Sequence, residues 1–183
     1  MGQSTTIRKM PGGAQQGRKV AKPLYTPEER RRRDSTGWTL VQGILAPVQF
    51  LVFLVSLALV LRYLLTGAGY EAATLSIILK TLVLYLIMVT GSLWEHAVFG
   101  RYLLAPAFYW EDMVSFVVIA LHTAYLVVVL GNLAGPQVQM GIALAAYATY
   151  VVNAAQFLLK LRAARLQAES EPELTSEGFE VMS

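Results

Sequence analysis

The sequence contains no cysteine and only two histidines among its 183 residues. The absence of cysteine excludes disulfides, thiolate metal sites, thiol nucleophiles and cysteine-held iron–sulfur clusters. Two histidines alone cannot form a His-rich zinc site. We expect no metal site of these kinds, and no cofactor that belongs to the chain itself.

Charged residues are also scarce. They make up 15% of the chain, against about 25% in a typical soluble domain, while hydrophobic residues make up 55%. Most of the basic residues lie in the first 33 positions, directly before long apolar runs. No aromatic residues interleave with the arginine run, so the basic block favours anionic lipid headgroups over nucleic acid. These features predict a membrane protein that does not bind nucleic acid.

Four apolar stretches are each near the roughly 20 residues that a helix needs to cross a bilayer. They cover residues 40–61, 73–93, 113–130 and 138–159. Turn-rich segments at 66–69 and 131–136 separate the first pair and the last pair. The predicted fold is all-α: a four-helix transmembrane bundle within a membrane domain at 26–166. We expect a disordered basic tail at 1–25 and an acidic disordered tail at 167–183, reached through a helical extension of the last span.

The membrane domain opens with a helix-start signal. Thr26 can cap the helix, Pro27 suits its first position, and Glu29 completes a capping box. The arginines at 30–33 then fit a turn at the membrane interface. Basic residues also flank the end of the fourth span, and the middle connection carries Arg101. The positive-inside rule therefore predicts that both termini and the 94–112 connection are cytoplasmic, in a bacterial inner or intracytoplasmic membrane.

Polar residues inside the spans follow helical spacing. Gln42, Gln49, Ser56 and Tyr63 recur every seven residues, so they share one face of the first span. Similar stripes occur in the other spans, and they indicate a bundle whose interior is partly polar at its cytoplasmic half. Asn153 and Gln156 in the fourth span are typical of hydrogen bonding between membrane helices.

Carboxyl groups gather around the middle connection and are the candidate catalytic residues. Glu111 and Asp112 follow the aromatic run 108–110, which is typical of the membrane interface. An acid at an apolar boundary can keep its proton and act as a general acid. Glu95 ends the second span and should lie near this pair, so that two carboxyls could divide acid and base roles. The alternatives are a solvated helix cap for Glu111 and Asp112 and a surface acid for Glu95.

Two basic groups lie within the apolar spans, where such groups are costly. His122 could be a structural histidine, a proton carrier or a metal ligand. Lys80 should lie at similar depth and could pair with His122, pair with a tyrosine, or extend toward the outer face. Arg101 is either a solvated residue or a clamp for an anionic group of a substrate.

Three segments carry a resemblance to a known family. They include GWTLVQGILAPVQFLVFLVSLALVLRYL, the connection containing LWEHAVFGRYLLAPAFYWEDMVSF, and AAYATYVVNAAQFLLKLRAARL. The sequence resembles the 3-vinyl bacteriochlorophyllide hydratases, also called 2-vinyl bacteriochlorophyllide hydratases, from about residue 24 to residue 166. The resemblance implies a hydro-lyase of bacteriochlorophyll biosynthesis that adds water to the C3-vinyl group of a chlorophyllide and gives a 1-hydroxyethyl group.

For such a substrate, the candidate residues acquire expected roles. Glu111 or Asp112 would protonate the vinyl group, and Glu95 would help to activate water. Tyr109, Trp110, Arg101, Lys80 and His122 are the expected substrate-binding residues, with His122 a candidate ligand of the magnesium that the chlorophyllide carries. Partners would be the tetrapyrrole, the bilayer and possible neighbouring enzymes of the same synthesis. The alternative is a non-catalytic pigment-binding or assembly protein; a transporter is disfavoured because inverted repeats are absent.

Overall fold

A computed structural model describes residues 24–180, with side chains described for 24–166. Within that range the chain forms α1 (Pro27–Ser35), α2 (Gly37–Thr66), α3 (Tyr70–Phe99), α4 (Tyr109–Leu130) and α5 (Pro136–Glu180), and no strands. The all-α expectation is confirmed, and four of these helices are long and apolar enough to cross a membrane. The predicted tail at 1–25 lies almost entirely outside the described residues.

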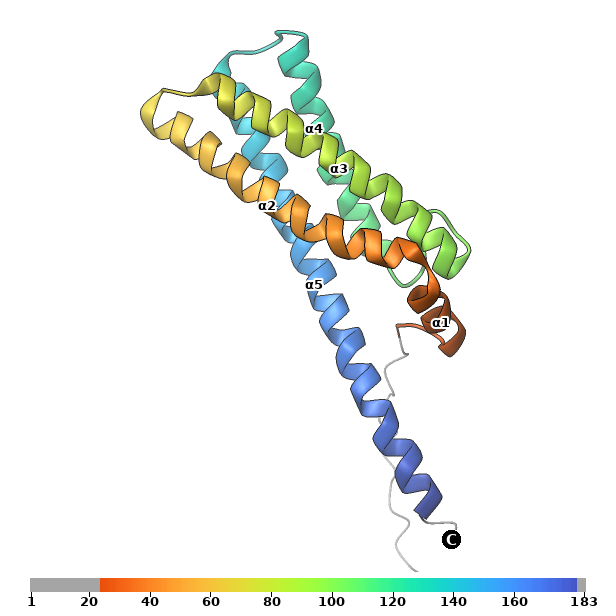
Figure 1. The fold of residues 1–183 in the computed structure, drawn as a ribbon. Coiled ribbons are helices and arrows are strands. Elements are labelled where there is room, and N and C mark those ends of the chain that lie inside the picture. The colour runs from red at the N-terminus through yellow and green to blue at the C-terminus, as the bar shows by residue number, and fades with distance from the viewer. Residues whose placement is uncertain (1–23, 181–183) are drawn as a thin grey trace, which may run out of the picture.

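The four long helices form two antiparallel hairpins (Figure 1). In the first, α2 ends at Thr66 and α3 begins at Tyr70, because Gly67 and Gly69 both adopt left-handed backbone conformations that suit glycine. In the second, residues 131–135 join α4 to α5. Both turns lie where the sequence predicts them.

The helices are longer than the apolar stretches predicted. α3 continues to Phe99 instead of residue 93, and α4 begins at Tyr109 instead of residue 113. The predicted connection at 94–112 therefore shortens to residues 100–108. Hydropathy marks only the apolar part of a helix, and each long helix here extends past that part. α5 also continues to Glu180, through much of the segment predicted as a disordered tail, in keeping with the helix formers Ala, Gln and Glu there.

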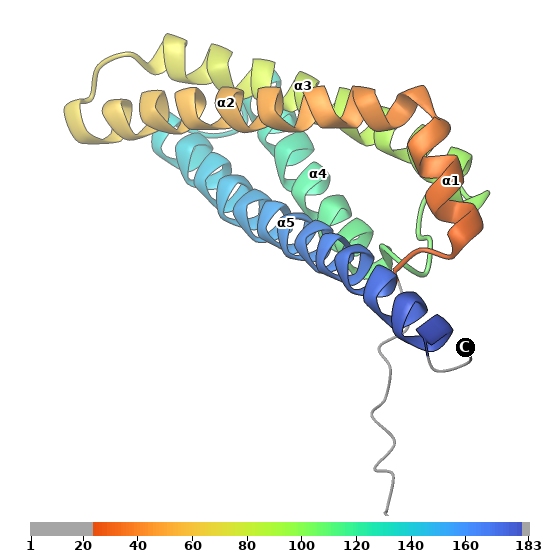
Figure 2. The ribbon, with the colours of Figure 1, turned by 60° about the horizontal axis from the view of Figure 1, so that its bottom comes forward.

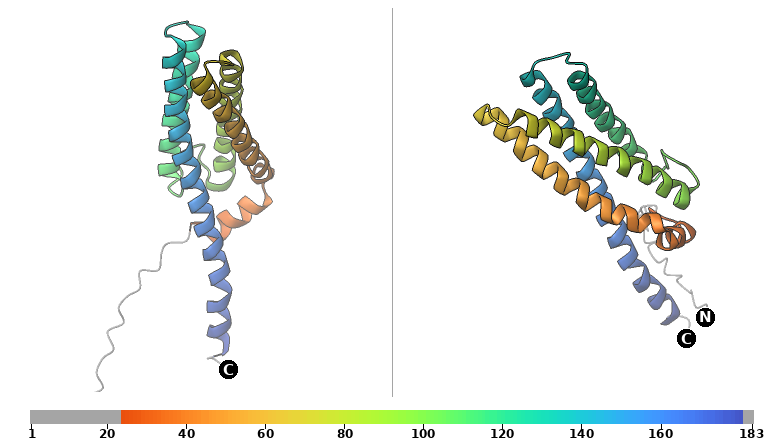
Figure 3. Two further views of the ribbon diagram at one scale, coloured as in Figure 1. Left: turned by 90° about the vertical axis from the view of Figure 1, so that its left-hand side faces the viewer. Right: turned by 45° about the horizontal axis from the view of Figure 1, so that its top comes forward.

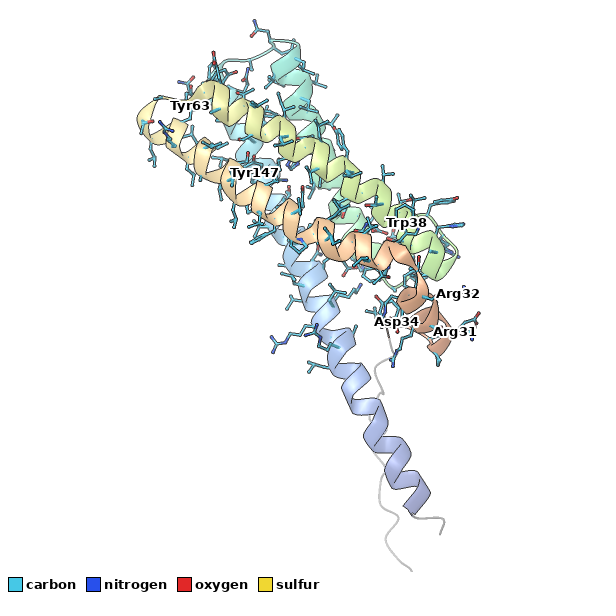
Figure 4. All side chains as sticks on the ribbon, viewed as in Figure 1. Arg31, Arg32, Asp34, Trp38, Tyr63 and Tyr147 are labelled. Atoms are coloured by element: carbon cyan, nitrogen blue, oxygen red, sulfur yellow. The ribbon has the colours of Figure 1, made fainter. Side chains whose placement is uncertain are left out.

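α1 lies across the end of the bundle and is not a fifth span (Figures 2 and 3). Its first turn has the predicted capping box, in which Thr26 and Glu29 exchange side-chain to backbone hydrogen bonds. Arg31 and Arg32 are exposed (Figure 4), whereas the Arg33 guanidinium lies 4.8 Å from the centre of the Tyr25 ring. None of the residues of α1 is buried, in keeping with a polar helix outside the apolar spans.

One end of the bundle carries an aromatic cluster that connects α1 to the long helices. Tyr25 stacks on Phe99, and Phe108 contacts Trp94 and Phe157. Through these rings the 100–108 connection is held against α3 and α5, on the same end as α1. The cluster therefore fixes the connection between the two helix ends that carry the candidate acids.

Candidate active site

Glu95 and Asp112 converge at the end of α3 and the start of α4. Both are buried, with 5% and 3% of their surface exposed, and their carboxyl groups lie within hydrogen-bonding reach of each other. A hydrogen bond between two carboxyl groups requires that one of them carry a proton. The pair can therefore both donate and accept a proton, which is what an acid–base reaction needs.

The 100–108 connection supplies the remaining hydrogen bonds of this carboxyl pair. The backbone N–H of Ala105 donates to Glu95 Oε2 at 3.1 Å, and that of Leu104 donates to Asp112 Oδ2 at 2.7 Å. Leu104 has a φ of +59°, a left-handed conformation that is unfavourable by about 1–2 kcal/mol for an L residue. This conformation turns two successive N–H groups toward the acids, in the manner of a backbone anion nest.

Glu111 has a different partner. Its Oε2 accepts a hydrogen bond from Lys160 Nζ at 2.6 Å, and Lys160 also donates to the Ala107 carbonyl. The two groups form an ion pair. Lys160 therefore connects α5 to both α4 and the connection, and Glu111 is bonded to this lysine instead of to the Glu95–Asp112 pair.

A second polar group lies deeper in the bundle. Lys80 Nζ is 2.9 Å from His122 Nε2, and both side chains are fully buried. His122 Nδ1 is 2.7 Å from the Val118 carbonyl oxygen. Because that oxygen can only accept, Nδ1 carries the proton and Nε2 accepts from Lys80. The sequence raised this pairing as one possibility, and the extension of Lys80 toward the outer face does not occur.

Aromatic rings enclose the Lys80 ammonium. It lies 4.0 Å from the centre of the Tyr150 ring, 5.3 Å from that of Tyr147 and 5.9 Å from that of Phe53. Tyr147 also exchanges a 2.5 Å hydrogen bond with Ser56, where α5 passes behind α2 and α3 (Figure 4). Residues from all four long helices therefore meet at this level, and cation–π contacts compensate part of the cost of burying the ammonium.

Comparison with known proteins shows to which family the chain belongs. Residues 25–163 match the family model described as 2-vinyl bacteriochlorophyllide hydratase. The chain is similar to the 2-vinyl bacteriochlorophyllide hydratase of Rhodobacter capsulatus, with 69% identity over 150 residues that cover 82% of this chain and 87% of the relative. The chain belongs to the 2-vinyl bacteriochlorophyllide hydratase family. The hydratase of Cereibacter sphaeroides is 68% identical over 148 residues, which cover 80% of this chain and 91% of that protein. No solved structure matches the chain.

The remaining residues expected to serve the hydratase family's substrate lie nearer the surface. Tyr109 and Trp110 are 44% and 71% exposed at the start of α4, and Arg101 is exposed in the connection. Two open surface hollows in the described part of the chain are lined by α1, and neither includes Glu95, Glu111 or Asp112. The structure thus brings Glu95 and Asp112 together in the interior, whereas Tyr109, Trp110 and Arg101 are exposed.

Sequence reasoning missed three contributors to the site: the N–H groups of Leu104 and Ala105, and the Lys160 ammonium. Backbone donors carry no residue signature, so the loop conformation could not have been read from the chain. Lys160 was visible only as a basic residue near the end of a span. Its 49-residue separation from Glu111 gives no local signal.

Proposed function

We propose that this chain adds water across the C3-vinyl group of a chlorophyllide and so forms a 1-hydroxyethyl group in bacteriochlorophyll synthesis. The buried Glu95–Asp112 pair, on a chain of a hydratase family, is the observation that carries the proposal. Relatives of 69% and 68% identity have this activity in their names. The reaction requires a proton donor, a proton acceptor and water.

The carboxyl pair can supply both proton transfers. Its shared proton moves to the terminal vinyl carbon, where the π electrons form the new C–H bond. The adjacent carbon becomes a cation, which the conjugated macrocycle stabilises. Water attacks that carbon and releases a proton to the carboxyl pair, which returns to its singly protonated state. No electron is gained or lost, so we propose that the chain uses no cofactor and that the magnesium belongs to the substrate.

The two carboxyl groups have the geometry that this cycle needs. Each already holds one backbone N–H, so neither must reorganise when its charge changes. Glu111, held by Lys160, would instead fix the connection that presents those N–H groups. We therefore assign the proton transfers to Glu95 and Asp112, and a supporting role to Glu111.

Tyr109, Trp110 and Arg101, which are exposed at the end of the bundle, would bind the substrate. The exposed rings of Tyr109 and Trp110 offer flat apolar contacts to a macrocycle that arrives through the bilayer. Arg101 can pair with an anionic group of the substrate at the interface. The expected roles of Lys80 and His122 stay predictions; magnesium ligation by His122 would first require Nε2 to leave Lys80.

A direct assay tests the function. Membranes containing the chain, incubated with a 3-vinyl chlorophyllide, are expected to form the 3-(1-hydroxyethyl) derivative, as measured by chromatography and mass spectrometry. Membranes without the chain are the control. A pigment that binds to the chain and is recovered unchanged would instead indicate a non-catalytic pigment-binding protein.

We also propose that the chain lies in the bacterial inner membrane with both termini and the 100–108 connection in the cytoplasm. Because the chain has no cysteine, single cysteines can report this orientation without background. In sealed inside-out vesicles, an impermeant thiol reagent is expected to label Tyr102→Cys and not Thr66→Cys. Both positions are exposed, the first in the 100–108 connection and the second at the last residue of α2. The reverse labelling would contradict the orientation.

A further inference from the structure

Two buried amide side chains in the bundle lack the hydrogen bonds that such groups normally make. Gln49 on α2 is 2% exposed, and neither its Oε1 nor its Nε2 has a protein partner among the described residues. Asn153 on α5 is 9% exposed, and its Oδ1 also has none. Leaving such a group buried and unsatisfied costs about 1–3 kcal/mol.

Gln156 on α5 also has an Oε1 without a partner among the described residues, but its side chain is only partly buried. Two other amides are hydrogen-bonded. Gln42, seven residues before Gln49 on the same face of α2, donates a hydrogen bond to Thr90 at 2.7 Å. Gln139 bonds to Tyr70 and to the Ala134 carbonyl. The hydrogen bonding between helices that the sequence predicts for Asn153 and Gln156 is confirmed at Asn153 Nδ2, which bonds to Ser115 on α4. Neither Gln156 Oε1 nor the Gln49 amide has a partner among the described residues.

Gln49 and Asn153 lie at the same level on facing helices. The Phe53 ring on α2 is 4.9 Å from the Tyr150 ring on α5, and these helices run antiparallel. Gln49 precedes Phe53 by about one turn, and Asn153 follows Tyr150 by about one turn. One amide thus comes from each helical hairpin, and both face the interior between them.

This level lies next to the carboxyl groups. Asn153 Nδ2 donates to Ser115 Oγ at 2.8 Å, and Ser115 donates to the Glu111 carbonyl at 2.9 Å. Ser115 follows Asp112 by three residues, a rise of about 4.5 Å along α4. The unsatisfied amide atoms therefore lie about one helical turn deeper in the bundle than the Glu95–Asp112 pair.

We propose that Gln49 and Asn153 hold the water molecule that adds to the vinyl group. An amide offers both a donor and an acceptor, so it can position water and then bond to the product hydroxyl. The water oxygen forms the new C–O bond with the cationic carbon, and one water proton passes to the carboxyl pair. This inference rests on the proposed function and makes the two amides positioning residues.

Hydrogen isotope exchange separates this role from a structural one. In D₂O, the carboxyl pair delivers deuterium to the terminal vinyl carbon. If water then fails to attack, loss of a proton returns a vinyl substrate that carries deuterium. The measured quantity is the ratio of deuterated recovered vinyl substrate to hydroxyethyl product. A variant that is only less stable forms less deuterated vinyl substrate and less hydroxyethyl product, so the ratio of the two stays at the wild-type value.

We expect Gln49→Met to raise this ratio by about tenfold or more, the effect of losing one well-placed hydrogen bond. Asn153→Leu is the second test, should Gln49→Met fail to fold. Gln42→Met, on the same helix face but bonded to Thr90, is expected to keep the wild-type ratio. An unchanged ratio in both Gln49→Met and Asn153→Leu would overturn the inference. A wild-type chain that makes no hydroxyethyl product would overturn the proposed function instead.

Discussion

Replacing Asp112 with Asn, or Glu95 with Gln, is expected to lower the turnover of vinyl chlorophyllide by about 100-fold or more. Each amide keeps an oxygen that can accept the N–H of Leu104 or Ala105, so the connection can hold its conformation. Neither amide can exchange a proton with the substrate. The decrease should therefore appear in the rate at which the bound vinyl chlorophyllide is converted to product. Single-turnover experiments with enzyme in excess measure this rate.

Glu71→Gln is the matched control for these variants. Glu71 lies in the first turn of the same helix as Glu95, at its other end, and it is exposed. Its replacement is expected to leave turnover unchanged. Wild-type turnover in both Asp112→Asn and Glu95→Gln would remove the carboxyl pair from the mechanism, although the family assignment would stand.

Lys160→Met is expected to lower the free energy of unfolding by about 3 kcal/mol. The variant leaves the Glu111 carboxylate, which is 9% exposed, without its ammonium partner, and it removes a donor from the Ala107 carbonyl. An uncompensated buried charge is the main cost. Unfolding of the purified chain in mixed detergent micelles, titrated with SDS, measures the change.

A double variant separates the charge from the packing. Adding Glu111→Gln to Lys160→Met removes the unpaired charge, so part of the lost stability should return. Arg162→Met, an exposed basic residue two positions further along α5, is expected to have little effect. If Lys160→Met unfolded at the wild-type SDS concentration, the ion pair would have no part in holding the connection.

The sequence was sufficient for features that depend on neighbouring residues. The spans follow from runs of apolar side chains, the α2–α3 turn from Gly67 and Gly69, and the start of α1 from Thr26 and Glu29. Each signal lies within a few residues of the feature that it specifies. Glu95 and Asp112 could be placed near each other because both adjoin one connection.

Features that depend on distant parts of the chain were not predictable in the same way. The partner of Glu111 lies on α5, and this ion pair distinguishes Glu111 from the Glu95–Asp112 pair. The left-handed Leu104 sets the direction of two backbone N–H groups, yet leucine gives no signal for that conformation. The missing partners of Gln49 become visible only when all helices are packed.

The activity of the double variant Glu95→Gln/Asp112→Asn tests the central claim most directly. If the two carboxyl groups share one proton and act as a unit, removing both should cost about as much turnover as removing the more important one. Single-turnover rates of the wild type, both single variants and the double variant supply the comparison. Losses that multiply in the double variant would show that the two groups act independently, and would contradict a shared-proton pair.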